Sequence, residues 1–130
     1  MSIYMKINTY HFGEVEFTDD KVITFDNGLC GFEDLKRYLF IKPDDSFFYW
    51  LNSIENPTIA FPLFGVRVLD SNFPQENSFE AFGITTLNPD PLKITVNLKA
   101  PVYINQNDKL GYQKIIDSDK YPVHYKLFSE

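Results

Sequence analysis

The chain has 130 residues, 44% of them hydrophobic and 17% aromatic, and a formal net charge of −6. This length predicts one domain with a sizeable core, and an aromatic share made of 13 Phe and 8 Tyr besides one Trp is typical of a β-rich interior. The acidic balance opposes non-specific binding to nucleic acid or to an anionic membrane, because both need clustered Lys and Arg. The single cysteine, Cys30, excludes an internal disulfide and a multi-cysteine metal site, and it fits a reducing compartment.

The sequence shows no pattern typical of secretion or of a membrane span. Residues 1–6 contain no long apolar region and no small-residue cleavage site, so they predict no secretion signal. The longest uninterrupted apolar run, 47–51, is far shorter than a membrane span. We therefore expect a soluble protein of the cytoplasm, built as a single domain over residues 1–130.

The first half of the chain alternates short apolar patterns with turn residues, which is typical of short strands. The predicted strands are 3–8, 14–17, 21–25, 39–41, 47–51 and 58–64, the last continuing over 66–69. The segment 28–38 differs, because its apolar residues recur at helical spacing and its acidic residues precede its basic ones, which suits the helix dipole. It predicts one or two helical turns that cap an open end of the sheet.

The second half continues in the same way after a polar loop over 70–78. Strands are predicted over 79–87, 94–105, 112–116 and 121–128, with a hairpin loop at 106–111. Short strands punctuated by Pro, Gly and Asn predict an all-β fold, a small antiparallel β-barrel or barrel-like sandwich with one or two short capping helices.

The stretch 94–105 carries the clearest alternation. Its pattern assigns Val96, Leu98 and Ala100 to the core and turns Asn97 and Lys99 away from it, toward a partner or toward solvent. Pro101 lacks the N–H that a sheet ladder needs, so it predicts a bend, a bulge or an edge position.

Catalytic and metal chemistry find little support. A nucleophilic Cys30 would need a positioned histidine, either His11 or His124, but no local signature accompanies the pair, and a small residue in a tight turn is the favoured interpretation. The histidines are isolated, and the acidic pairs lack the pattern of a calcium loop. The sequence predicts a binding module without catalytic residues, cofactor or metal.

Two other classes of binding module stay open. The aromatic residues could form a base-stacking platform on an OB-like barrel, although the basic groove that such binding needs is missing. A small-ligand-binding β-barrel is also compatible with the sequence.

Three segments together resemble the FliW family of flagellar assembly factors. Ile23-Thr24-Phe25 with Gly28-Leu29-Cys30-Gly31-Phe32-Glu33 is similar to the family's I-x-F…G-L-P-G-F-E. Phe48–Pro57 with Ile59-Ala60-Phe61 is similar to P-F-x-W-L-Q-S-x-E-x-P…A-F, and Val96–Asn105 is similar to N-L-x-A-P-I-x-I-N, followed by Gly111 and Gln113 of G-x-Q. Cys30 stands where the family usually has Pro, Asn52 where it has Gln, and the segment between Leu63 and Leu92 is shorter than we expect for the family.

The resemblance implies a cytoplasmic regulator that binds two proteins and catalyses nothing. It implies that the protein binds newly made flagellin through the C-terminal helical region of flagellin. Once flagellin is exported, the free protein is expected to bind the RNA-binding translational repressor CsrA, from a surface beside the RNA site, and thereby to release flagellin translation. No direct contact with nucleic acid or with a membrane is implied.

Candidate residues for these roles lie within the second and third motif segments. Trp50, Leu51 and Asn52 are candidate partner-binding residues, because Trp often dominates interface energetics, with core packing as the alternative. Asn97 and Lys99 are candidates on the outward face of their strand, with an ordinary solvated face as the alternative. The structural residues of the motifs are Gly28, Gly31, Phe32, Ala100 and Pro101.

Overall fold

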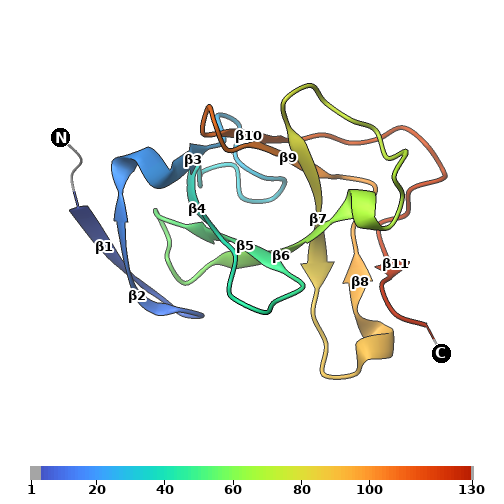
Figure 1. Cartoon of the computed structure of the whole chain (residues 1–130), viewed down its shortest axis with the longest axis horizontal. Helices are drawn as coiled ribbons and strands as arrows, with labels where there is room; N and C mark the ends of the chain where they lie inside the picture. The colour runs from blue at the N-terminus through green and yellow to red at the C-terminus, as the bar shows by residue number, and fades with distance from the viewer. Residues whose placement is uncertain (1–3, 130) are drawn as a thin grey trace.

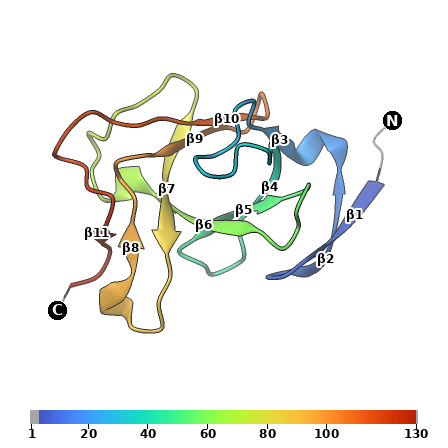
Figure 2. The ribbon, with the colours of Figure 1, turned by 180° about the vertical axis from the view of Figure 1, so that it is seen from behind.

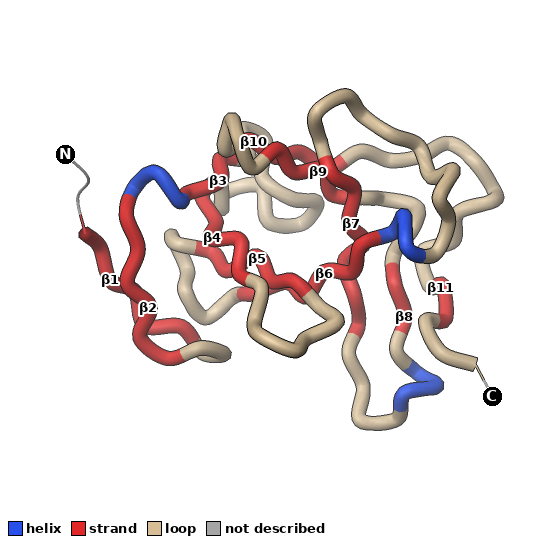
Figure 3. The backbone as a smooth tube through the Cα atoms, in the orientation of Figure 1, coloured by secondary structure: helices blue, strands red, loops and turns tan. Residues whose placement is uncertain are grey.

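The structure, a computed structural model, describes residues 4–129, so Ile3 of the first predicted strand lies outside the described part. Within that range it contains 3-10 turns and no regular α-helix (Figure 3). The strands are β1 (Tyr4–Thr9), β2 (Gly13–Thr18), β3 (Val22–Thr24), β4 (Arg37–Ile41), β5 (Tyr49–Ser53), β6 (Ala60–Gly65), β7 (Glu80–Thr86), β8 (Thr95–Val96), β9 (Val102–Asn105), β10 (Leu110–Gln113) and β11 (Tyr125–Lys126). The 3-10 turns are Asp19–Lys21, Val66–Val68 and Pro91–Lys93.

Seven of these strands close into a barrel, seen nearly end-on in Figure 1. Their order is β7-β6-β5-β4-β3-β10-β9, and the pairing of β9 with β7 closes the ring. The prediction of an all-β barrel is confirmed. One pair of strands departs from the antiparallel pattern, because β10 pairs with β3 in parallel through Leu110 and Thr24. A ring with an odd number of strands cannot alternate direction throughout, so one parallel neighbour is required.

The predicted strand over 94–105 is two strands that pair with the same edge of β7. β9 pairs with Glu80–Phe82, and β8 pairs with Thr85 and Thr86 further along. Between them the chain leaves the ladder after Asn97, whose N–H still donates to the carbonyl of Ile84 in β7 at 2.9 Å, so the predicted interruption around Pro101 is confirmed. The branch point is Gly83 in β7, where a Cβ atom would lie 2.3 Å from Cγ1 of Val96. Only glycine lets β8 approach there.

The barrel interior is filled by apolar side chains that alternate along the strands. The residues of this first core are Ile23, Phe25, Leu29, Tyr38, Leu51, Leu63, Phe82, Val102 and Ile104, none more than 2% exposed. Alternation turns the intervening residues of β7 and β9 to the outer face. There Ala81 and Tyr103 join a second core that also includes Val66, Phe73, Val96, Leu98, Ile116 and Tyr121. The chain after β10 runs back over this face and covers it (Figures 1 and 2).

The first two strands form a separate hairpin beside the barrel (Figures 1 and 2). Among the described residues, no strand pairing or backbone hydrogen bond joins this hairpin to the barrel. Side chains hold it instead. The rings of His11 and Phe12, at its tip, have centroids 4.9 and 5.7 Å from the ring of Trp50 in β5. Phe17 of β2 is buried.

The predicted helix over 28–38 was wrong. The segment forms consecutive turns with one isolated bridge between Leu29 and Phe32. Gly28 and Gly31 have φ values of 65° and 86°, in the left-handed region that a right-handed helix cannot contain. Helical spacing of the apolar residues here reflects tight turns, which place Leu29 and Phe32 against the barrel end.

Three predicted strands differ most from the structure. Residues 66–68 form a 3-10 turn in place of a continued strand, and β10 spans Leu110–Gln113 in place of 112–116. Of 121–128 only Tyr125 and Lys126 pair, in β11. Val123 is 47% exposed, so the alternation that predicted an inward face there does not correspond to a buried one. Among residues 4–129, no helix is long and apolar enough to cross a membrane.

Candidate partner-binding site

The glycine-rich loop after β3 is a compact series of turns. The N–H of Gly28 donates to the carbonyl of Phe25 at 2.9 Å, and the N–H of Phe32 donates to that of Leu29 at 2.7 Å. A Cβ atom on Gly28 would lie 2.7 Å from both the Cα of Glu33 and the carbonyl oxygen of Phe32. Gly28 therefore satisfies two needs at once, a left-handed φ and a close backbone approach.

The side chain of Gln113, at the end of β10, joins this loop to the bend after β8. Its Oε1 accepts the N–H of Cys30 at 2.8 Å, and its Nε2 donates to the carbonyl of Ala100 at 3.0 Å. The residue thus connects two segments that carry the family-like motifs and that are 70 positions apart (Cys30 to Ala100). The side chain of Gln suits this position, because its amide group carries both a hydrogen-bond acceptor, the carbonyl oxygen, and a donor, the NH2 group.

The third motif segment, around Phe48–Pro57, contacts the same loop through Glu55. The Glu55 carboxylate accepts the backbone N–H groups of Lys36 and Arg37 at 3.2 and 3.0 Å. Arg37 also forms a partly exposed ion pair with it at 3.6 Å. Burial, and after it the nearby Glu55 charge, raises the pKa of Tyr38 to about 12, which keeps that core phenol neutral. The three motif segments therefore meet at one end of the barrel.

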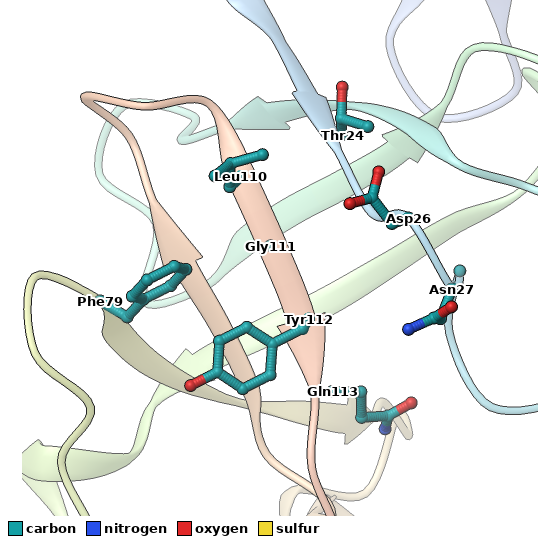
Figure 4. A pocket seen from close by; sticks show the side chains of 9 residues that line it. Thr24, Asp26, Asn27, Phe79, Leu110, Gly111, Tyr112 and Gln113 are labelled. Atoms are coloured by element: carbon teal, nitrogen blue, oxygen red, sulfur yellow. The ribbon is translucent and has the colours of Figure 1, made fainter.

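A groove of about 220 Å³ opens between this loop and β10 (Figure 4). Its lining residues are Thr24, Asp26, Asn27, Gly28, Phe79, Leu110, Gly111, Tyr112 and Gln113. At Gly111 the backbone of β10 lies directly against the core, because a Cβ atom there would lie 2.3 Å from the buried Phe25 ring. The groove combines backbone, one carboxylate and two aromatic rings, which suits contact with a protein better than binding of an anion.

Trp50, Leu51 and Asn52 are adjacent in β5 but lie in different environments. Trp50 is half-buried on the outer face, against His11 and Phe12 of the hairpin tip, and keeps exposed surface. Leu51 and Asn52 have no exposed surface. Leu51 belongs to the first core. Neither side chain is accessible to a partner in this structure.

The Asn52 amide is a structural group of the turn after β5. Its Nδ2 donates to the carbonyls of Ser53 and Pro57 at 3.1 and 3.2 Å. Its Oδ1 and the hydroxyl of Tyr38 are buried and have no hydrogen-bond partner among the described residues. The shorter Asn, where the family usually has Gln, thus serves the local turn, and its carbonyl oxygen stays unused.

Asn97 and Lys99 are both half-buried at the bend between β8 and β9. The Asn97 Oδ1 accepts the N–H groups of Lys99 and Ala100, each at 3.0 Å, and so holds the chain away from the sheet ladder. The Lys99 ammonium lies 3.4 Å from the carbonyl of Ser118 in the covering segment. The side chain of Asn97 therefore stabilises the bend, and the Lys99 ammonium places a positive charge beside it.

The structural motif residues occupy the positions that hold these segments together. Gly31 has a left-handed φ, and the Glu33 carboxylate accepts its N–H at 2.6 Å. Phe32 packs edge-to-face on Phe61, with centroids 5.0 Å apart. Pro101 is buried, and its carbonyl accepts the N–H of Lys114 at 3.1 Å.

Sequence reasoning missed two residues of this site. Asn27 carries no pattern that predicts a long-range role, because it resembles an ordinary turn residue. Glu55 is marked in the sequence only as the Glu of the family-like second motif, which does not identify the backbone N–H groups that it accepts. Gln113 is marked in the sequence only by the family-like G-x-Q, which does not identify its partners. Within residues 4–129, no group of three or more His, Cys, Asp or Glu side chains is placed to hold a metal ion.

The fold and the site define a small all-β barrel protein in which the first motif segment and Gln113 line a surface groove. Hydrogen bonds to Glu55 and to Ala100 hold the other two motif segments close to the first. The sequence model of the family described as FliW protein matches residues 6–127. The chain belongs to the FliW family.

Two curated relatives illustrate the similarity. The flagellar assembly factor FliW of Thermoanaerobacter pseudethanolicus is 37% identical over 142 aligned residues, covering 97% of this chain and 95% of that protein. The flagellar assembly factor FliW of Clostridium botulinum is 36% identical over 147, covering 97% and 99%. Both alignments are longer than this chain of 130 residues, so both relatives carry insertions relative to it.

A solved structure supports the fold independently. The structure described as the crystal structure of the flagellar assembly factor FliW superposes with a TM-score of 0.87 and covers 97% of this chain and 99% of that one. Its sequence identity is 24%, so it bears on the fold alone.

Proposed function

We propose that this protein is a non-enzymatic flagellar assembly factor of the cytoplasm. It binds flagellin through the C-terminal helical region of flagellin. When free of flagellin, it binds CsrA and relieves the repression of flagellin translation. The observation that carries the proposal is the family match over residues 6–127, together with relatives named as flagellar assembly factors that align over nearly their whole length.

Flagellin binding is proposed as the docking of a helix against apolar anchors on a rigid sheet. Trp50 supports this role, because it lies on the outer face of β5 and its ring is positioned by His11 and Phe12. A ring that is held in place before binding loses little rotamer freedom on contact, which favours affinity. The rigid barrel behind it contributes the fixed surface.

Antagonism of CsrA is proposed to be electrostatic. The chain carries 18 acidic and 12 basic residues. An acidic body docked beside a phosphate-binding surface repels RNA over about one Debye length, roughly 8 Å at physiological salt. We propose that protein contact occurs on the surface formed by Lys99, Asn97 and the groove beside Gln113, since Gln113 joins the first and third motif segments there.

The small-ligand alternative finds less support. The barrel interior is filled by the first core, so the place where such barrels hold a ligand is occupied by side chains. An OB-like nucleic-acid binder would need clustered cations on one face, and the overall charge has the opposite sign.

The proposal is tested by co-elution of the purified protein with the C-terminal segment of flagellin and, separately, with CsrA. Both are expected to form complexes. Trp50→Ala should weaken the flagellin complex, and Tyr4→Ala, at an aromatic residue of β1 that is 79% exposed, serves as the matched control. Absence of both complexes at micromolar concentrations would refute the proposed function.

A further inference from the structure

Asn27 and Gly28 are the one Asn-Gly pair in the chain. In such a pair the backbone nitrogen of the glycine can attack the side-chain Cγ of the asparagine, because glycine has no Cβ to obstruct the approach. A bond forms between this nitrogen and Cγ, the Cγ–Nδ2 bond breaks, and ammonia leaves. Water then opens the cyclic imide to aspartate or isoaspartate. Water is the only co-reactant, and no group is oxidised or reduced.

The structure exposes the side chain of Asn27 but restrains the nucleophile. Asn27 is exposed and lines the groove opposite β10 (Figure 4). The attacking nitrogen, that of Gly28, donates its proton to the carbonyl of Phe25 at 2.9 Å and is therefore directed into the turn. Gly28 itself is buried, and its open side faces the backbone of Glu33. The imide cannot form without displacing this turn.

The turn is fastened on both sides of the pair. The Lys36 ammonium donates to the carbonyl of Asp26 at 2.8 Å, immediately before Asn27. After Gly28, the N–H of Cys30 donates to Gln113 of β10. Opening the segment requires loss of these contacts, and both lie at the solvent-exposed surface, where local opening costs least.

We propose that Asn27 is a deamidation site that the closed turn of residues 25–33 protects, and that it reacts when this segment opens. The reaction adds a negative charge beside Asp26 in the groove. The isoaspartate product also lengthens the backbone by one methylene, immediately before a glycine whose surroundings leave no spare volume. The turn of residues 25–33 is therefore hindered from closing again after the reaction. The fraction of Asn27 that has become aspartate or isoaspartate thus reports how often the segment has opened.

Asn77 provides an internal reference. It is exposed in the loop before β7 and is followed by Ser78, whose backbone N–H has no hydrogen-bond partner among the described residues. The side chain of serine hinders imide formation more than the single hydrogen atom of glycine does. In an unfolded chain Asn27 should therefore react faster than Asn77, and folding should slow Asn27 selectively.

The test follows deamidation of the full chain by peptide mapping at mildly alkaline pH, in buffer and in guanidinium chloride, with isoaspartate detected by enzymatic methylation. We expect Asn27 to be the faster site in guanidinium and to slow by at least about tenfold on folding, which corresponds to an opening free energy of about 1.4 kcal/mol or more. Asn77 should slow by less. Gln113→Ala should accelerate Asn27 in buffer and leave Asn77 unchanged.

Should Gln113→Ala not fold, the wild-type protein at guanidinium concentrations below its unfolding transition takes its place. There the Asn27 rate should rise before the far-ultraviolet circular dichroism signal changes. Equal rates for Asn27 in buffer and in guanidinium would overturn the proposal. So would an Asn27 rate in buffer that responds neither to the Gln113 variant nor to sub-denaturing guanidinium.

Discussion

Gln113 Oε1 accepts a hydrogen bond from the backbone N–H of Cys30 at 2.8 Å, although the two residues are 83 positions apart. The same amide reaches the carbonyl of Ala100 on its other side. The loop that contains the left-handed glycines and the bend that interrupts the sheet ladder are thus fixed to one strand end. The groove proposed for partner contact depends on this connection.

Replacing Gln113 by Ala should lower the free energy of unfolding by about 1–2 kcal/mol, because two hydrogen bonds are lost and two backbone groups are left without partners. Chemical denaturation measures the change. Gln75→Ala, at an exposed position of the loop before β7, is the matched control and should be close to neutral. Wild-type stability of the Gln113 variant would mean that solvent replaces the connection without cost.

Gly111→Ala should destabilise the protein by about 1–3 kcal/mol, because the added methyl group would meet a buried ring in a filled core. A Cβ atom built at Gly111 would lie 2.3 Å from the Phe25 ring. Gly65→Ala is the control, since a Cβ there would meet only Val68, at 3.9 Å. Thermal unfolding of both variants gives the comparison. Equal melting temperatures would show that Phe25 yields without strain.

Asn97→Ala and Lys99→Ala should separate structure from binding. Loss of the Asn97 carbonyl leaves two backbone N–H groups of the bend without an acceptor, and stability should fall by about 1 kcal/mol. Lys99→Ala should change stability by less than about 0.5 kcal/mol and should weaken one partner complex. Titration calorimetry with flagellin and with CsrA measures the second effect. Wild-type affinity of the Lys99 variant for both would remove it from the proposed surface.

Acid should loosen the segment that covers the second core. The backbone N–H of Asn72, and after it Tyr121 and Lys120, hold the pKa of Asp70 below its ordinary value of 3.8. Lys114 likewise lowers the pKa of Glu76 from 4.5. Because both values are depressed on folding, the carboxylates stabilise the protein above their ordinary values, and this contribution is lost as the pH falls through the folded-state values.

The measurement is the melting temperature between about pH 6 and about pH 3. Asp70→Asn combined with Glu76→Gln should flatten the acid decrease, whereas Asp44→Asn, at an exposed loop residue, should not. An unchanged acid profile in the double variant would assign the decrease to other carboxylates.

Much of the barrel could be predicted because its strands are short, alternating and separated by turn residues. Pro101 indicated the interruption of the 94–105 stretch, and the structure places it at the junction of β8 and β9. The helix over 28–38 was mispredicted because spacing alone does not distinguish a helix from successive turns. The left-handed glycines decide between them, and at Gly28 the close backbone approach of Phe32 and Glu33 also leaves no space for a side chain.

The site was harder to predict than the fold. Alternation assigned Asn97 to the outer face, but its carbonyl is used by the bend itself, a role that depends on where the ladder ends. Trp50 and Asn52 share a strand face. Only the tertiary structure shows that the turn after β5 buries Asn52, whereas Trp50 stays partly exposed beside the hairpin tip. Contacts between distant segments, such as that of Gln113, leave no local pattern.

The proposed function depends above all on the exchange of this protein between flagellin and CsrA. The most direct measurement follows the fluorescence anisotropy of a labelled RNA bound to CsrA while this protein is added, followed by the C-terminal segment of flagellin. We expect the anisotropy to fall when the protein is added and to recover when flagellin is added. Anisotropy that stays constant on adding the protein, or that does not recover with flagellin, would contradict the proposed exchange.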